Sequence, residues 1–131
     1  MSMFERHFTL AEANALLPTL RRRLARLQAL DARLEPLCEQ HGAALGEGLA
    51  SNVGGAQFAD YLKLSVRWRV ALEEIFASGV QVKDVSTGLC DFPHLLPDGR
   101  EVLLCWQANE REVSHWHTIE GGFAARRPIE G

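Results

Sequence analysis

The sequence has little of several features that mark special classes of protein. Only three of its 131 residues are cysteine (Cys38, Cys90 and Cys105), and they form no CxxC pair. An odd number of cysteines without such spacing does not predict a disulfide framework, and it fits a reducing compartment. The first residues show no signal-peptide core, and no apolar run approaches the roughly 20 residues that a membrane-spanning helix needs. We therefore expect a cytoplasmic protein that is not bound to a membrane.

A strong charge of one sign is also lacking. The net charge is -3, so no positive field attracts nucleic acid, and we expect no nucleic-acid partner. The run Arg21-Arg22-Arg23 spreads through about 200° on a helix, which favours a solvated face over a phosphate contact. Length and a hydrophobic content of 47% predict one domain over residues 1–131.

The N-terminal part carries helix signals. Thr9 and Glu12 have the spacing of a capping box, which predicts a short helix over residues 10–17. Pro18 lacks an amide donor and disfavours helical geometry at the residue before it, so we expect a sharp kink or break there, with Pro18 in the first turn of the next helix. Leucines at steps of three and four then predict an amphipathic helix of about five turns.

A second helix follows a glycine-rich stretch. Residues 41–55 contain five glycines and no GK[ST] signature, so they predict a flexible connection and not a phosphate loop. A helical pattern resumes near Ala56, and Gly79 supplies a left-handed residue to end it. Two long helices joined in this way favour an antiparallel helical pair over residues 8–79.

After Gly79 the apolar spacing changes from helical to alternating. Four strands are predicted, at residues 80–85, 89–92, 101–106 and 112–117. Pro93 is expected to stop pairing in the second strand. Sequential strands with short turns favour an antiparallel meander, so residues 80–131 should form a β-meander with a tail docked through Phe123 and Ile129. The predicted fold class is α+β, a long antiparallel helical pair packed on a small antiparallel β-meander.

Four segments are similar to a known family. They are FTLAEANALLP (8–18), GVQVKDVSTGLCDFP (79–93), LCWQANEREVSHWH (104–117) and GGFAARRPI (121–129). Together they resemble a small uncharacterised bacterial family, a domain of unknown function. The family has glycine where this chain has Asn109 and Ala125, and an aromatic residue where it has His115. The resemblance implies no known activity, substrate or cofactor, but it directs attention to Asp91, Trp106, Glu110, Trp116, His117 and Arg126.

His115 and His117 are the candidate metal ligands. Residues two apart on a strand share a face, so the two imidazoles could bind one metal ion, completed by Cys105, Asp91, Glu110 or His94. The departure from the family at His115 counts against a metal role that the family shares. We favour the alternative, in which His117 is a partly buried histidine hydrogen-bonded to a carboxylate, and we expect no cofactor.

Asp91, Glu110 and His117 are the candidate catalytic residues. Two carboxylates on one pocket wall could perform general acid–base catalysis, but the strand register that decides this is not fixed by the sequence. Glu110 could instead brace its turn through Arg111 or Arg126, and Asp91 could accept from turn amides. A Cys105–His117 nucleophile–base pair is disfavoured, because no nucleophile elbow or oxyanion loop surrounds the cysteine.

Trp106, Trp116 and Arg126 are candidate ligand-binding residues. Arg126 could clamp a small anionic ligand through a carboxylate or phosphate, or it could pair with Asp91 or Glu110 and hold the tail, which we favour. Both faces of the central strands carry apolar residues, so the second face should be covered by the tail or by a partner subunit. This motivates a homodimer prediction.

Two functions remain open from the sequence. The first is a non-enzymatic interaction or ligand-binding module. The alternative is a small metal-binding protein or hydrolase-like enzyme that uses Asp91, Glu110 and His117. Convergence of these side chains and Arg126 on an open cleft would favour the alternative, and a buried His117 saturated by internal bonds would favour the first.

Overall fold

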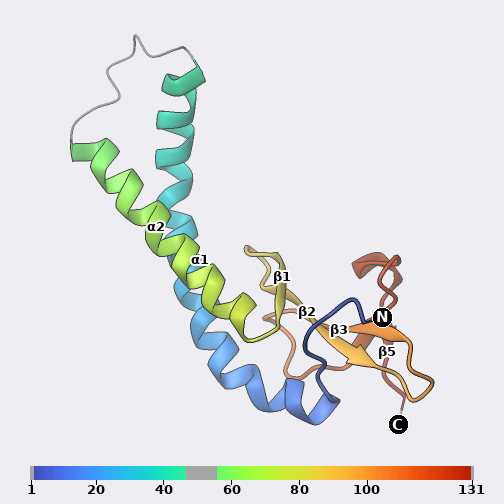
Figure 1. Ribbon diagram of the computed structural model, residues 1–131. Coiled ribbons are helices and arrows are strands. Elements are labelled where there is room, and N and C mark those ends of the chain that lie inside the picture. The colour runs from blue at the N-terminus through green and yellow to red at the C-terminus, as the bar shows by residue number, and fades with distance from the viewer. Residues whose placement is uncertain (1, 47–55, 131) are drawn as a thin grey trace.

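The computed structural model describes residues 2–46 and 56–130, apart from the side chains at 39–46 and 56–57. Its elements are α1 (Leu10–Gly46), α2 (Ala56–Ala77), β1 (Gln81–Asp84), β2 (Leu89–Leu95), β3 (Glu101–Trp106), β4 (His115–His117), a short 3-10 helix (Phe123–Ala125) and β5 (Arg127–Pro128). The two helices run antiparallel and pack against each other, and one half of this pair lies beside the sheet (Figure 1). None of the described helices is both long and apolar enough to cross a membrane.

The start of α1 follows the predicted capping box. The backbone N–H of Thr9 donates to the Glu12 carboxylate at 2.8 Å, and the backbone N–H of Glu12 donates to the Thr9 hydroxyl at 3.0 Å. Two backbone donors that have no partner inside the helix are satisfied in this way. The left-handed Gly79 after α2 is also confirmed, with a φ of 96°.

Of the kink or break predicted at Pro18, the break is wrong, because α1 is continuous and contains Pro18. Leu17 and Leu20 on either side of it are both buried in the core. Their burial outweighs the one backbone hydrogen bond that a proline removes. The ribbon of α1 changes direction after its first turns (Figure 1), which is the usual effect of an internal proline. Of the connection predicted at 41–55, residues 41–46 belong to α1 instead, and residues 47–55 lie outside the described part of the chain.

The strands confirm the antiparallel meander and the α+β class. The sheet order is β1-β2-β3-β4-β5, and every neighbouring pair is antiparallel. The fourth strand is shorter than predicted, and a fifth was not predicted: β5, in the tail, pairs with β4. The β2–β3 register places Asp91 opposite Cys105, and the β3–β4 register places Leu103 opposite His117.

The expectation that Pro93 ends the second strand is also wrong. β2 continues to Leu95, and Pro93 lies opposite Leu103 of β3. Pairing between β1 and β2 reaches only Asp91, so beyond it β2 has a free side. The carbonyl of Pro93 accepts from the Phe8 backbone N–H at 2.7 Å on that side. A proline is tolerated there because no ladder bond needs its missing donor.

The two faces of the sheet differ in chemistry. The first face places Cys90, Phe92, Leu104 and Trp106 in one buried cluster with helix residues such as Leu24. The second face presents Asp91 and His117, the buried polar side chains among the described residues, together with Leu103 and Cys105. Tail residues line the cleft over this second face. Within one chain the tail therefore provides the cover, and the homodimer stays a prediction.

Candidate functional site

Strand register assembles three ligand-bearing side chains on the second face, here called the buried triad: Asp91, Cys105 and His117. Asp91 on β2 lies opposite Cys105 on β3, and His117 on β4 lies opposite Leu103, two residues from the cysteine. One ligand atom from each residue lies within 4.8 Å of the other two. All three residues are buried. The sheet therefore holds a carboxylate oxygen, a sulfur and an imidazole nitrogen together without contributions from a loop.

Both ring nitrogens of His117 face acceptors. Nδ1 lies 2.7 Å from the Thr118 carbonyl oxygen, and Nε2 lies 3.1 Å from Oδ1 of Asp91. A carbonyl oxygen has no proton to donate, so Nδ1 carries the hydrogen. Nε2 then faces a carboxylate oxygen, and two lone pairs at that separation repel each other. A proton or a cation must therefore lie between Nε2 and Oδ1.

Cys105 is a poor nucleophile in this setting. Burial, and next the negative charge of Asp91, raise the pKa of the Cys105 thiol to about 12. Such a thiol is neutral at pH 7, whereas the attacking species in cysteine chemistry is the thiolate. The geometry therefore argues against a Cys105–His117 nucleophile–base pair in the metal-free protein.

A cleft of about 250 Å³ reaches the triad from the tail side. It is lined by Lys83, Leu89, Asp91, Leu103, His117, Ile119, Gly122 and Phe123. Lys83 is an exposed residue of β1, and Phe123 of the tail is 44% exposed. Lys83 was not singled out in the sequence, and its place on β1, two residues from the partner of Asp91, brings it to this cleft. Two triad members thus line the cleft, and both are nearly closed to solvent.

Glu110 and Arg126 form a separate ion pair. Nη2 of Arg126 donates to both carboxylate oxygens of Glu110, at 2.9 and 2.7 Å. Glu110 also accepts from the backbone N–H of Gln107 at 2.8 Å, and Nδ1 of His115 lies 3.7 Å from its other oxygen. This pair braces the turn after β3 and ties the tail to it, as the second alternative from the sequence proposes. Of the candidate catalytic residues, the structure brings Asp91 and His117 into contact, whereas Glu110 pairs with Arg126 beside His115, the residue opposite Cys105 on β3.

Three further candidates from the sequence, Trp106, Trp116 and His94, do not line the cleft. Trp106 is fully buried on the helix-covered face, and its indole N–H donates to the Glu110 carbonyl at 3.0 Å. Trp116 packs against the same core. Nδ1 of His94 lies 2.6 Å from the Phe8 carbonyl and donates to it. These three side chains are engaged in packing and in fixing the backbone.

Arg21 was not singled out from its neighbours in the sequence, yet it fixes the turn beside the ion pair. Its guanidinium donates to the carbonyls of Ala108, Glu110 and Arg111, at 2.9, 2.7 and 3.2 Å. It also lies over the Trp106 ring, 5.0 Å from the ring centroid. No local sequence pattern announces this role, because the partners lie almost ninety residues away.

The chain belongs to the family described as Uncharacterized conserved protein (DUF2203), whose family model matches residues 6–129. This confirms the resemblance to an uncharacterised family, and the match covers nearly the whole chain. Neither a curated protein nor a solved structure matches the chain.

Proposed function

We propose that this protein is a ligand-binding module whose ligand is a divalent metal ion of the Zn²⁺ class, held by Asp91, Cys105 and His117. The observation that carries the proposal is the convergence of the three ligand atoms within 4.8 Å. Ligands with bonds of about 2.0–2.3 Å to a tetrahedral zinc lie about 3.3–3.8 Å apart. The 3.1 Å between Nε2 of His117 and Oδ1 of Asp91 is close to that spacing.

The surroundings of His117 support the same reading. Histidine ligands of metals donate their other ring N–H to a carbonyl or carboxylate, which fixes the ring and its tautomer. The 2.7 Å bond from Nδ1 to the Thr118 carbonyl supplies this contact and aims Nε2 at Asp91. A cation bound there would take the place of the proton between these two atoms.

The donor set favours zinc over harder or softer ions. Oxygen, nitrogen and sulfur donors together suit a borderline ion, whereas Mg²⁺ and Ca²⁺ take oxygen ligands. Binding requires the Cys105 thiolate, so the metal ion would displace the thiol proton that burial otherwise retains.

Three protein ligands leave a fourth position for a water molecule or a ligand from the cleft. An incomplete protein ligand set is typical of catalytic zinc, which activates water or polarises a carbonyl. Lys83 lines the same cleft, so a small anionic ligand fits the fourth position best. The finer form of the proposal is therefore a cytoplasmic metal-binding protein with hydrolase-like chemistry, and this form does not require Glu110.

The test measures metal binding by tag-free protein. Equilibrium dialysis should give one Zn²⁺ per chain, and Co²⁺ as a probe should give visible bands together with a thiolate-to-cobalt charge-transfer band. Cys105→Ser should abolish the charge-transfer band, and His117→Gln should weaken Co²⁺ binding at least tenfold. Cys90→Ser is the matched control, because Cys90 is equally buried and lies on the opposite face of the same sheet.

The outcome that rejects metal binding is equally defined. If folded wild-type protein takes up no stoichiometric Zn²⁺ or Co²⁺, the triad is a buried hydrogen-bonded cluster with a structural role. A cobalt spectrum that survives Cys105→Ser but changes with Cys90→Ser would also reject the assigned ligands. Circular dichroism of each variant shows whether a lost signal reflects a lost ligand or a lost fold.

A further inference from the structure

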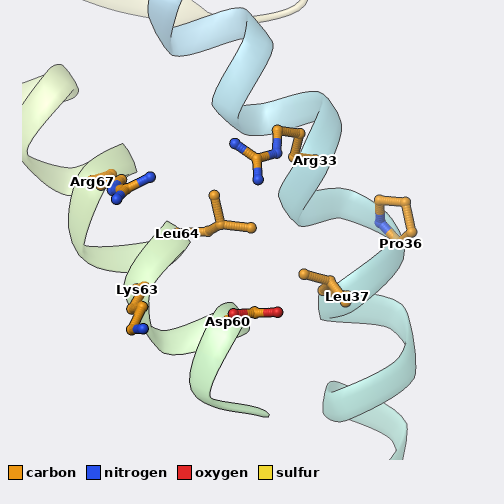
Figure 2. A pocket seen from close by; sticks show the side chains of 7 residues that line it. All are labelled: Arg33, Pro36, Leu37, Asp60, Lys63, Leu64 and Arg67. Carbon is orange, nitrogen blue, oxygen red and sulfur yellow. The ribbon is translucent and has the colours of Figure 1, made fainter. Parts of the chain in front are cut away.

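A second candidate site lies on the helical pair, away from the sheet. A cleft of about 570 Å³ between α1 and α2 is lined by Arg33, Pro36, Leu37, Asp60, Lys63, Leu64 and Arg67 (Figure 2). A further cleft of about 270 Å³ is lined by Arg26, Ala29, Leu30, Arg33 and Arg67. Arg33 and Arg67 line both, so the two hollows adjoin and are here called the basic cleft. Its total size is within the range of small-molecule sites.

Helical spacing brings the cations of the basic cleft together. Arg26 and Arg33 are seven residues apart on α1, which is close to two turns, so they share a face. Lys63 and Arg67 are four residues apart on α2 and are neighbours on its surface. Figure 2 shows the guanidinium groups of Arg33 and Arg67 pointing into the gap from facing helices, above Leu64. The two helices thus present arginines to one another across a shared space.

The charges in this cleft are not balanced. Four cations face one carboxylate, that of Asp60, although the whole chain has a net charge of -3. None of the four cations forms an ion pair or hydrogen bond with another residue in the described parts of the chain. Arginines that face each other without a counter-ion repel, and an external anion would relieve that repulsion.

We propose that the basic cleft binds a small organic phosphate. Guanidinium groups bind phosphate through two parallel hydrogen bonds, and a phosphate monoester carries a charge of about -1.5 to -2 at pH 7, which suits several cations. The apolar part of the lining, Leu30, Leu37 and Leu64, would take the organic part of the ligand. Nothing in this site overlaps the buried triad, so the proposal stands or falls separately from metal binding.

Calorimetric titration with phenyl phosphate and inorganic phosphate at low ionic strength tests the proposal. Phenyl phosphate should bind the full chain more tightly than inorganic phosphate, because only the former contacts the apolar lining. Arg33→Gln and Arg67→Gln should each weaken phenyl phosphate binding about tenfold or more, as expected for a lost charge-assisted hydrogen bond. Asp60→Asn should strengthen it, because it removes the one negative charge in the cleft.

Arg69→Gln is the matched control. Arg69 is an exposed arginine two residues from Arg67, and it lines a different hollow. It should leave binding unchanged, while amide NMR shifts on titration should map to residues 26–33 and 60–67. Exposed substitutions of this kind rarely change folding stability appreciably, so a folding defect will not obscure the result. No binding at millimolar phenyl phosphate, or equal weakening by Arg69→Gln and Arg67→Gln, would overturn the proposal.

Discussion

The two faces of the sheet are built from the same strands and differ in what their residues do. On the helix-covered face, Phe92 and Leu104 join a continuous apolar core. Their neighbours along the strands, Asp91 and Cys105, point to the tail-covered face, where His117 lies beside them. An apolar face tolerates many combinations of apolar side chains with a similar total volume. A buried polar face is stable only if each acceptor is hydrogen-bonded to a donor. A register slip of one residue would exchange the faces, so the apolar core fixes the geometry of the triad.

The largest expected effect belongs to the apolar face. Phe92→Ala removes a fully buried ring that packs edge-to-face on Phe8, with 5.3 Å between ring centroids. We expect a loss of roughly 3–5 kcal/mol in the free energy of unfolding, measured by urea denaturation. A loss under about 1 kcal/mol would mean that the helices contribute little to holding this face.

The triad should respond differently to single and double changes. Asp91→Ala leaves Nε2 of His117 buried without a partner, and we expect a loss of roughly 1–3 kcal/mol in the free energy of unfolding. Replacing both residues with apolar ones, as in Asp91→Val with His117→Leu, should restore much of that loss, because no polar group stays unpaired. The same double variant should bind no Zn²⁺. If the double variant loses more stability than the Asp91→Val and His117→Leu single variants lose in total, the contrast between the faces is wrong.

The tail should loosen when its ion pair is removed. Arg126→Gln removes the charge that binds Glu110, at a cost of about 1–2 kcal/mol for a partly buried pair. Its most direct readout is hydrogen exchange at Ile129, whose N–H donates to the Ser114 carbonyl at 2.8 Å. Exchange at Ile129 should accelerate, while amides of β2 and β3 keep their protection. Uniform acceleration across the sheet would show that the tail is not a separate unit.

The smallest expected effect concerns Glu101 at the start of β3, and it is seen as a pH dependence of stability. Hydrogen bonds from the Met3 backbone N–H and next from His7 lower the pKa of the Glu101 carboxyl from 4.5 to about 2. A pKa that is lower in the folded state gives stability above the unfolded value, and this stability is lost as the pH falls from about 4.5 towards 2. In Glu101→Gln the urea midpoint should fall less between pH 5 and pH 2 than in the wild type. Parallel pH profiles of the two proteins would contradict this role.

Local signals predicted the local parts of this fold. The Thr9–Glu12 capping box, the limits of the strand at 101–106 and the left-handed Gly79 depend on neighbours in sequence, and they were read from it correctly. The prediction of a helix break at Pro18 is wrong because it counts the cost of one lost hydrogen bond and omits the burial of Leu17 and Leu20.

The site depended on information that no local pattern contains. Asp91 and His117 are 26 residues apart, and their contact follows from the pairing of β2, β3 and β4. The sequence identifies these two residues as candidates, but it does not contain the strand register that joins them to Cys105. β5 has two residues and includes Pro128, so it carries no alternation from which to predict a strand.

The contacts of Glu101 also affect the order in which parts of a newly made chain can fold. Its carboxylate accepts a hydrogen bond from the backbone N–H of Met3 at 2.6 Å, and the two residues are 98 positions apart in the sequence. At a synthesis rate of about 5–20 residues per second, the first residues would wait roughly 5–20 s for this partner to be made. The capping box at Thr9 needs only its own neighbourhood, so α1 can form during that interval. The N-terminal segment before α1 should therefore be among the last parts of a newly made chain to become fixed.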